Sequence, residues 1–383
     1  MIIKRKIAPE ILTLSRQFPV ITITGPRQSG KTTLAQMLFP DKPYTNLEDM
    51  EQRDFAVHDP KGFLEQFPDG AVIDEIQRAP NLCSFIQVIV DKTKKNGFFI
   101  LTGSHQFEMM SNISQSLAGR TAIIRLLPFD LEEAYPNAKK QLLDILYTGF
   151  YPGIFQNKIN PSKFYSFYIA TYIERDLHQL VNIKDLSRFE TFIRLCAGRT
   201  GQLLNYTSLS NECGTDQKTM KNWLSILEAS FIIKLLKPYY KNLGKRLVKA
   251  PKLYFYDTGL ACYLLGIKKP EHLQNHPLFG NLFENFIIAE VIKNSFNKVE
   301  TENLFFFRDH SGHEVDLVFD NITSIRLLEI KAAKTIHSTF FAPFRYFETL
   351  DIPVEKSYLV YGGEQSYKRE GIHVKAWKDI GEI

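Results

Sequence analysis

Residues 20–34 read VITITGPRQSGKTTL, and this stretch decides the architecture of the first third of the chain. Its alternating apolar residues predict a strand over 20–24, because successive side chains of a strand point to opposite faces. A loop follows, and a helix is expected to begin at Lys31. The pattern GxxxxGK followed by Ser or Thr runs from Gly25 to Thr32, in the strand–loop–helix context that this pattern requires. The stretch therefore predicts a phosphate-binding loop, or P-loop, in an α/β domain.

The residues of this loop have the chemistry needed to bind ATP. Glycines let backbone N–H groups curl around phosphates, and a helix N-terminus adds partial positive charge. Lys31 is expected to reach the β- and γ-phosphates, and the Thr32 hydroxyl to bind Mg²⁺. The alternative is a glycine-rich turn with an unrelated lysine, but such a turn would not require the flanking strand and helix. The predicted nucleotide-binding residues of the loop are Gly25, Gln28, Ser29, Gly30, Lys31, Thr32 and Thr33.

Two further strands are predicted to end in polar side chains. GAVIDEIQRAP, residues 70–80, ends a short apolar run at Asp74 and Glu75. Asp74 is expected to hold Mg²⁺ through water, and Glu75 to orient the attacking water, although Asp74 as a helix N-cap is an alternative. A strand in FFILTGSHQF ends at Thr102 and Ser104, which are suited to contacting the γ-phosphate.

A fourth strand, TAIIRLLPF, follows the sequence SLAGR and so places Arg120 beside a turn. We expect Arg120 to act as an arginine finger, in the same chain or from a neighbouring subunit. A solvated or ion-paired arginine is the alternative. The finger interpretation allows a homo-oligomer formed through the ATPase domain.

Composition limits the class of protein. The 383 residues are 44% hydrophobic and 23% charged, as expected for two or three globular domains. No apolar run is long enough to span a membrane, and the first residues lack the apolar core of a secretory signal, so we expect a cytoplasmic protein with no membrane partner. The four cysteines form no CxxC pair, which predicts buried, reduced thiols. A net charge of +5 alone says little about partners.

The middle of the chain is predominantly helical, from Pro128 to about Gly201, which predicts a lid or connector. Residues 186–266 then show the order helix, short helix, turn, helix and two strands, which is typical of a winged helix. Lys218 and Lys221 of its third helix are expected to contact nucleic acid, with DNA favoured over RNA. A packing, oligomerisation or protein-docking module is the alternative.

A run of basic residues follows this third helix. Seven basic side chains and no acidic one occur from 234 to 252, namely Lys234, Lys237, Lys241, Lys245, Arg246, Lys249 and Lys252. Phosphate contacts call for such a basic wing. Lys245, Arg246 and Lys249 are the predicted contacts.

The last third contains HEVDLVFDNITSIRLLEIK, in which charged side chains occupy positions where apolar residues would pack better. Asp316 and Glu329, from adjacent predicted strands, are expected to bind Mg²⁺ because a hard cation prefers oxygen ligands. Lys331 is expected to orient or activate the attacking water. Glu284, one helix earlier, could add a ligand or support one, as could Glu314.

The predicted element order supports this interpretation. A helix, a meander of three strands, a helix and a strand is the core order of the PD-(D/E)xK nuclease-like fold. A surface hairpin with solvated charges is the alternative.

The chain resembles bacterial and archaeal AAA-type ATPases fused to the domain of unknown function 4143. The resemblance rests on GPRQSGKTTL, VIDEIQRAP, ILTGS, SLAGR, YIERDL, YDTGL, FEN, EVDLVF and LEIK, which are spread over nearly the whole chain. It implies an ASCE-class, AAA-like P-loop NTPase with a parallel sheet, in which the sensor strand lies between the P-loop and Walker B strands. It further implies a winged-helix domain and a C-terminal restriction-endonuclease-like α/β domain.

We therefore predict an ATPase domain over 1–130, a helical lid or connector over 131–185, a winged helix over 186–266 and a nuclease-like domain over 267–383. The predicted function is binding and hydrolysis of ATP, with Mg²⁺, in a protein that acts on nucleic acid and carries an Mg²⁺-dependent nuclease-like domain. The alternative is a nucleotide-switched DNA- or protein-binding regulator without nuclease activity.

Overall fold

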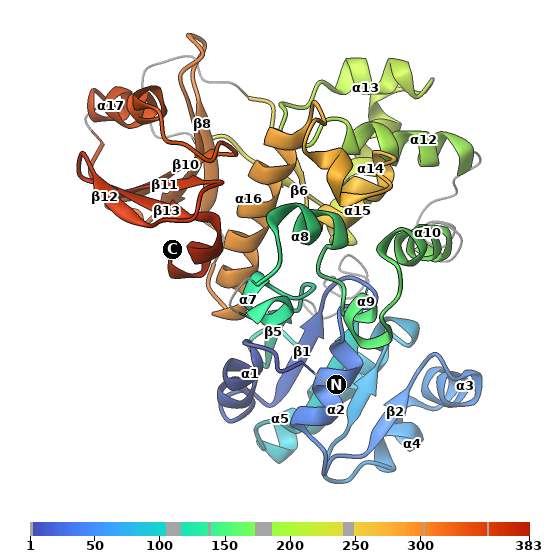
Figure 1. The fold of residues 1–383 in the computed structure, drawn as a ribbon. Coiled ribbons are helices and arrows are strands. Elements are labelled where there is room, and N and C mark those ends of the chain that lie inside the picture. The colour runs from blue at the N-terminus through green and yellow to red at the C-terminus, as the bar shows by residue number, and fades with distance from the viewer. Residues whose placement is uncertain are drawn as a thin grey trace. The chain divides into compact units, whose positions relative to one another are not determined.

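The computed structural model describes residues 3–104, 116–136, 139–172, 186–239, 249–301, 303–350 and 352–383. Two units are present. The N-terminal unit comprises residues 1–129, 229–231 and 295–300, and the C-terminal unit comprises 130–228, 232–294 and 301–383. Figure 1 shows the course of the chain through both units.

The N-terminal unit is built on a five-stranded parallel sheet in the order β2-β3-β4-β1-β5. Its strands are β1 (Val20–Thr24), β2 (Tyr44–Asn46), β3 (Val72–Asp74), β4 (Phe99–Gly103) and β5 (Thr121–Arg125). Its helices are α1 (Ala8–Ser15), α2 (Lys31–Leu38), α3 (Met50–His58), α4 (Pro60–Glu65), the short η1 (Ile76–Arg78) and α5 (Leu82–Thr93). Because β4 lies between β1 and β3, the predicted ASCE strand order is confirmed.

Helices cover both faces of this sheet, since alternate residues of each strand point to opposite sides. Ile21 and Ile23 of β1 are buried in one cluster with Ile11 of α1 and with residues of α2. Val20 lies in a second cluster, which includes residues of α3, α4 and α5. The carboxyl ends of the parallel strands are thus left at one edge of a layered α/β sheet, where ligands of such folds bind.

The C-terminal unit begins with helices. They are α7 (Leu131–Ala134), α8 (Leu142–Thr148), α9 (Pro152–Asn157), α10 (Pro161–Tyr172), α12 (Leu186–Ala197), α13 (Tyr206–Glu212) and α14 (Gln217–Ala229). An antiparallel pair, β6 (Ile233–Leu236) and β7 (Lys252–Phe255), follows α14. The element order of a winged helix is therefore present, and Trp223, Leu224 and Leu227 of α14 are buried.

The remainder of this unit contains a six-stranded sheet in the order β12-β13-β11-β10-β9-β8. Its strands are β8 (Leu304–Arg308), β9 (Glu314–Asp320), β10 (Ile325–Lys331), β11 (Val354–Tyr361), β12 (Tyr367–Arg369) and β13 (Ile372–Ala376). The other elements are α15 (Thr258–Leu264), η4 (Pro270–Leu273), α16 (Phe279–Asn297), η5 (Ser338–Phe341), α17 (Ala342–Glu348) and η6 (Trp377–Glu382).

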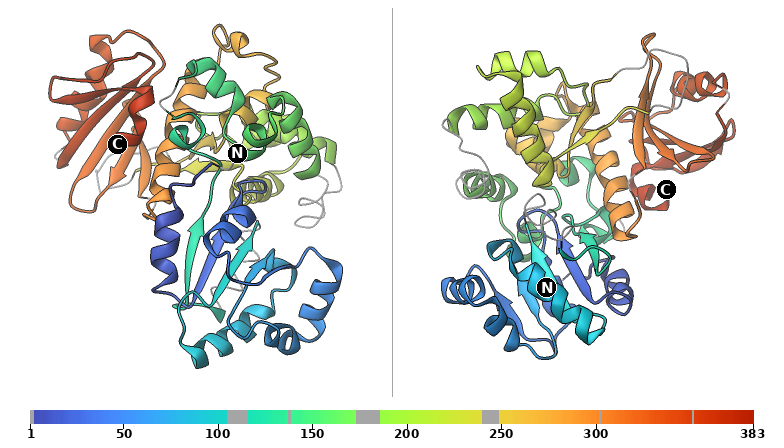
Figure 2. Two further views of the ribbon diagram at one scale, coloured as in Figure 1. Left: turned by 60° about the horizontal axis from the view of Figure 1, so that its bottom comes forward. Right: turned by 180° about the vertical axis from the view of Figure 1, so that it is seen from behind.

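Strand direction divides this sheet into two parts. β8, β9 and β10 form the predicted antiparallel meander, whereas β10, β11 and β13 are parallel. Phe344 and Phe347 of α17 are buried against Val318 and Leu327 of the sheet, and the views in Figure 2 show the strands side by side. The predicted order of helix, meander, helix and strand is confirmed, and β12 and β13 were not predicted.

A buried carboxylate, Asp257, connects three segments of the C-terminal unit. It caps α15 by accepting a hydrogen bond from the Leu260 N–H at 2.9 Å. It also accepts one from the Tyr165 hydroxyl of α10 at 2.6 Å and one from the Phe150 N–H at 2.8 Å. Gly149 has φ +69° and a Cβ there would lie 2.1 Å from the Tyr165 hydroxyl, so this close approach requires glycine.

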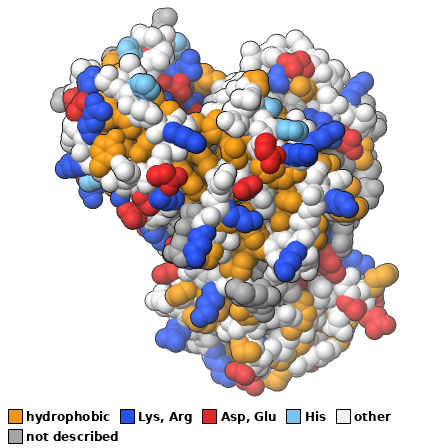
Figure 3. Space-filling model, viewed as in Figure 1, with side chains coloured by type: hydrophobic (Ala, Val, Ile, Leu, Met, Phe, Trp, Pro, Cys, Tyr) orange, Lys and Arg blue, Asp and Glu red, His pale blue; other side chains and the backbone are white. Residues whose placement is uncertain are grey.

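The structure also bears on the expectations drawn from composition. All four cysteines are buried and free, as predicted. None of the helices in the described ranges combines the length and the apolar character needed to cross a bilayer. Figure 3 shows basic side chains dispersed among acidic ones on the face it presents, in keeping with a small net charge.

Candidate functional site

The P-loop joins β1 to α2 at the carboxyl edge of the N-terminal sheet, as predicted. Gly25 has φ +151°, and a Cβ there would lie 2.1 Å from the Leu126 carbonyl oxygen, so only glycine fits. Gln28 and Gly30 also have positive φ, at 60° and 91°. Gly30 is the N-cap of α2 and makes no side-chain capping bond, which leaves the helix N-terminus suited to an anion.

Lys31 and Ser29 are held inside the loop. The buried Lys31 ammonium donates to the Gly25 carbonyl at 3.1 Å and to the Pro26 carbonyl at 2.7 Å. The Ser29 hydroxyl is fully buried and has no hydrogen-bond partner among the described residues. A buried polar atom without a partner costs free energy, which a bound phosphate or water would recover. Thr33 is exposed on α2.

Arg5 supports the loop and was not found from the sequence. Its guanidinium donates to the Ser29 carbonyl at 2.9 Å and to the Leu127 carbonyl at 2.7 Å. The segment that precedes α1 thereby fixes the loop next to Leu127, two residues after β5. No local pattern marks Arg5, because its partners lie 24 and 122 residues away.

Asp74 is the point at which the predicted P-loop and Walker B residues meet. It accepts hydrogen bonds from the Thr32 hydroxyl at 2.7 Å, from the Tyr44 hydroxyl at 2.9 Å and from the Thr102 hydroxyl. Asp74 is buried and its carboxylate caps no helix in these contacts, so the N-cap alternative is not supported. Tyr44 was not predicted, and its pKa is raised by burial and by the Asp74 charge.

Glu75 follows directly and has φ +57°, in the left-handed region that a residue with a Cβ rarely adopts. Its carboxylate accepts hydrogen bonds from the Gln77 amide and, at 3.3 Å, from the Ser104 hydroxyl. Strained backbone at the end of a strand is common at functional sites. The structure thus brings Glu75 and Ser104 together at the same sheet edge as Asp74.

Arg120 lies at the opposite edge of the sheet. Its carbonyl accepts a hydrogen bond from the Val20 N–H at 3.1 Å, so it sits beside the first residue of β1. The length of β1 separates this position from the P-loop, roughly 15 Å at about 3.3 Å per residue. The Arg120 guanidinium instead pairs with Asp91 of α5 at 2.6 Å. A finger role within one chain does not fit this placement, and a role in a neighbouring subunit stays a prediction.

Three of the five residues predicted to contact nucleic acid lie within the described ranges. Lys218 and Lys221 of α14 are exposed, as is Lys249. Lys245 and Arg246 lie outside the described residues. Lys252 was counted in the same basic run, but it is buried, and that interpretation of Lys252 is wrong.

Asp316, Glu329 and Lys331 lie together in the C-terminal sheet. Asp316 and Glu329 are buried, so these charges are not the solvated charges of a surface hairpin. Lys331 pairs with Glu329 at 2.5 Å, and Asp316 accepts a hydrogen bond from the Ile330 N–H at 2.8 Å. Burial and the charge of Asp316 raise the pKa of Glu329.

Glu284 of α16 joins this cluster through Lys252 of β7. The Lys252 ammonium lies 3.0 Å from Glu284, 2.5 Å from Glu314 and 3.8 Å from Asp316. The Tyr254 hydroxyl also donates to Glu284, at 2.5 Å. Burial alone would lower the pKa of Lys252, but Tyr254 and these carboxylates raise it overall. Glu284, Glu314, Asp316, Glu329 and the two lysines are called the carboxylate cluster below.

The carboxylate cluster was predicted to hold Mg²⁺. Its oxygen donors suit a hard cation, and the buried Glu329 Oε2 has no hydrogen-bond partner among the described residues. However, no group of three or more His, Cys, Asp or Glu side chains in the described ranges has an arrangement that would hold a metal ion. The Lys252 ammonium already contacts Glu284 and Asp316, so a metal does not fit while Lys252 is in place.

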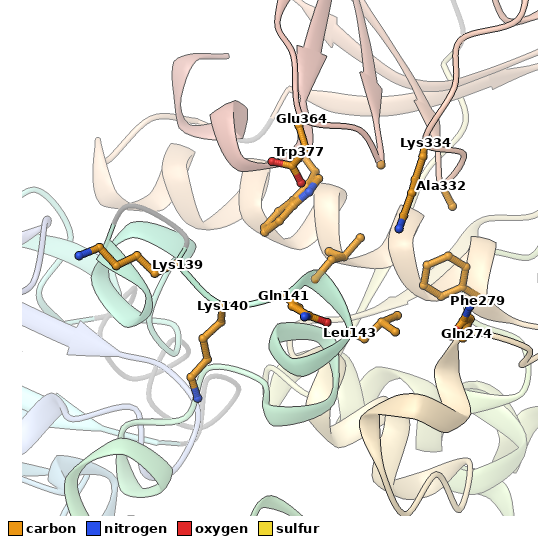
Figure 4. Close-up of a pocket in the computed structure, with 12 residues that line it drawn as sticks. Lys139, Lys140, Gln141, Leu143, Gln274, Phe279, Ala332, Lys334, Glu364 and Trp377 are labelled. Carbon is orange, nitrogen blue, oxygen red and sulfur yellow. The ribbon is translucent and has the colours of Figure 1, made fainter.

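A cavity of about 630 Å³ lies at the carboxyl ends of β10, β11 and β13. Ala332 follows Lys331 directly and lines it, as do Gly362 after β11 and Trp377 after β13. Figure 4 shows Lys334 directed toward the space between Trp377 and Phe279. Lys334 makes no ion pair within the described chain, and Lys139 and Lys140 add positive charge to the lining.

Three protein-family models match successive parts of the chain. Residues 17–135 match the model of an AAA domain, residues 139–271 match a domain of unknown function, DUF8612, and residues 279–379 match another, DUF4143. The chain joins an AAA domain to a DUF4143 domain. The predicted resemblance is therefore confirmed, and the N-terminal unit contains an AAA-type ATPase domain.

Two mycobacterial proteins and several solved structures are similar to this chain. An uncharacterized protein of Mycobacterium tuberculosis and one of Mycobacterium bovis are each 29% identical over 339 residues, which is 88% of this chain and 75% of each relative. Among solved structures, a Walker-type ATPase of Pyrococcus abyssi is similar over 69% of this chain and 96% of its own, with 13% identity and a TM-score of 0.45. AMPPCP-bound DnaA from Aquifex aeolicus is similar over 58% and 85%, with 12% identity and a TM-score of 0.31.

Proposed function

We propose that this protein hydrolyses ATP at the P-loop and that its nucleotide state controls contact with nucleic acid. The observation that carries the first part is the 2.7 Å hydrogen bond between Thr32 and Asp74. It brings the residue after the P-loop lysine to the carboxylate at the end of β3. P-loop NTPases hold Mg²⁺ between a hydroxyl and a carboxylate of these two kinds.

Each residue of this site has a distinct proposed role. The loop N–H groups and Lys31 bind the phosphates, which requires Lys31 to exchange its two carbonyl contacts for phosphate oxygens. Thr32 and Asp74 would hold Mg²⁺, which supplies positive charge to the β- and γ-phosphates. Glu75, held near Ser104, orients the water that attacks the γ-phosphate.

A Glu75→Gln variant tests this assignment, because it removes the negative charge while keeping the size of the side chain. We expect ATP hydrolysis to fall by at least about tenfold, with ATP affinity within twofold of wild type, since water positioning acts on the chemical step alone. Glu65→Gln, at an exposed position of α4, is the matched control. Equal hydrolysis by wild type and Glu75→Gln would remove Glu75 from this role.

Nucleic-acid binding is the second part of the proposal. Lys218 and Lys221 are exposed on α14, and Lys249 is exposed in the segment before β7, where they can contact phosphates. Lys334 is unpaired within the described chain and points into a cavity beside the strand end that carries Lys331. The alternative is that α14 docks a protein. In that case, replacing these lysines would not change binding of DNA. DNA is the favoured ligand because the winged helix is chiefly a reader of duplex DNA.

Metal-dependent cleavage of nucleic acid is a second candidate function. The observation in its favour is that Asp316, Glu329 and Lys331 lie together in a buried cluster. The full-length protein, incubated with DNA and Mg²⁺ or Mn²⁺, would then nick the substrate, and Lys331→Ala would not. If wild type leaves every DNA and RNA intact, the nucleotide-switched regulator without nuclease activity is the correct function.

A role for Arg120 requires a second copy of the chain. We propose that a neighbouring subunit presents Arg120 to the nucleotide after its pair with Asp91 opens. ATP turnover per chain would then rise with protein concentration in wild type but not in Arg120→Ala. Turnover that is independent of concentration in both proteins would exclude this role.

A further inference from the structure

Lys252 lies in the carboxylate cluster, and none of the functions proposed above gives it a role. Lys252 is the first residue of β7, and its side chain is only 3% exposed. Its ammonium contacts Glu284 of α16 and both Glu314 and Asp316 of β9. A buried ammonium is costly unless carboxylates compensate its charge, and here three of them do so.

Lys252 is fixed in this place by its own strand. The backbone of Phe255, three residues on, donates to the Asn285 side-chain oxygen at 2.6 Å and accepts from its amide at 2.9 Å. The Gly201 N–H donates to the Leu253 carbonyl at 2.7 Å. β7 also pairs with β6 along its length. Lys252 therefore belongs to a strand anchored on both sides.

The number of charged groups in the carboxylate cluster indicates which ion could take the place of Lys252. Four carboxylates face three cations, since Arg308 also pairs with Glu314 at 2.9 Å. Without Lys252, the four carboxylates, when all are ionised, would exceed the remaining two cations by two charges, which is the charge of one divalent ion. Carboxylates brought together without a compensating cation repel one another.

From this geometry we infer that the Lys252 ammonium and a divalent cation compete for the same carboxylates. The site is closed to metal as long as β7 holds Lys252 against Glu284, Glu314 and Asp316. This inference builds on the second candidate function, because it concerns the same cluster, and it adds that metal binding and cleavage require Lys252 to leave. Lys252 is thus a residue that controls which cation the C-terminal site accepts.

Metal-dependent thermal stability tests the competition in the full-length protein without nucleotide. We expect Mn²⁺ to leave the melting temperature of wild type unchanged. Lys252→Gln should melt at a lower temperature without metal and recover by at least about 3 °C with saturating Mn²⁺, because the ion restores the lost charge. Lys252→Arg, which keeps the positive charge, should stay insensitive to Mn²⁺. Adding Asp316→Asn to Lys252→Gln should abolish the recovery.

Two outcomes would overturn the inference. One is a folded Lys252→Gln protein that gains neither stability nor calorimetric binding from Mn²⁺. The other does not depend on Lys252→Gln: Mn²⁺ binding by wild type that Asp316→Asn removes would show that metal and Lys252 occupy the cluster together. The second measurement decides the matter if Lys252→Gln does not fold. ATP hydrolysis is assayed separately, so a failure at the P-loop leaves these results interpretable.

Discussion

Replacing Lys31 by methionine isolates the charge that the P-loop offers to ATP. Methionine keeps most of the apolar stem of the lysine, so the buried space stays filled. The variant loses the two hydrogen bonds from the ammonium to the Gly25 and Pro26 carbonyls. It also loses the cation that would contact the β- and γ-phosphates.

The expected loss of ATP affinity follows from those contacts. Hydrogen bonds to a charged group are worth about 1.5–3 kcal/mol each. Because Lys31 must release two carbonyls before it can contact two phosphate oxygens, most of that energy cancels. The net contribution of Lys31 to ATP binding is then its extra attraction to the charged phosphates, which we take as equal to about one hydrogen bond to a charged group. ATP should therefore bind about 10- to 150-fold more weakly to Lys31→Met.

Calorimetric titration with ATP and Mg²⁺ measures this loss directly. Lys92→Ala, which removes an exposed lysine from the last turn of α5, should bind ATP as wild type does. Circular dichroism and melting temperature show whether Lys31→Met is folded. A folded Lys31→Met protein that binds ATP within threefold of wild type would refute the role assigned to Lys31.

Three further outcomes follow from other contacts. Lys218→Ala with Lys221→Ala should weaken DNA binding and lower the slope of log affinity against log salt by up to about 2, because each phosphate contact contributes about 0.9; an unchanged slope would favour protein docking. Tyr44→Phe should cost about 1 kcal/mol of unfolding free energy, since the buried Asp74 loses one of its donors; denaturant unfolding measures it, and no loss would contradict the contact. Asp309 directly follows β8 and accepts hydrogen bonds from the Tyr346 hydroxyl and from His313. Burial tends to raise the pKa of Asp309, but these hydrogen bonds lower it to about 2 overall. The stability that this carboxylate contributes is therefore complete above its unfolded pKa near 4 and lost as pH falls toward 2, and Asp309→Asn should flatten that part of the pH profile of melting temperature.

Each of these variants has a matched control at an exposed position. Lys163→Ala with Lys158→Ala removes two lysines outside the winged helix. Tyr367→Phe removes a hydroxyl from a side chain that is 42% exposed. Asp41→Asn removes an exposed carboxylate. A control that behaves like its test variant would show that the effect does not come from the named contact.

The N-terminal site could be predicted from the sequence because its chemistry lies in short local patterns. The seven positions from Gly25 to Lys31 define the loop, and the strand that ends at Asp74 is a continuous apolar run. Parallel strands place their carboxyl ends at one edge, and Thr102 at the end of β4 accordingly donates to Asp74 at the end of β3. Arg120 could not be placed in the same way, because it precedes its strand and therefore lies at the other edge.

Only part of the carboxylate cluster could be predicted from the sequence, because some of its residues are far apart along the chain. Alternation along β10 puts Glu329 and Lys331 on the same face, where their side chains pair. Lys252 looked like one more cation in a basic run, and its carboxylate partners lie 32 to 64 residues further along the chain. Local composition gives the charge of a side chain but not whether tertiary packing will bury it.

The buried Asp257 determines where the C-terminal unit can be cut. Its donors come from the Phe150 backbone and from Tyr165, both in the segment that the sequence assigned to a connector. A protein truncated to begin at residue 186 would keep the carboxylate and lose two of its three donors. A dissected fragment would therefore need to start upstream of Gly149 to be stable. The predicted connector, residues 131–185, is therefore a structural part of the unit that contains Asp257.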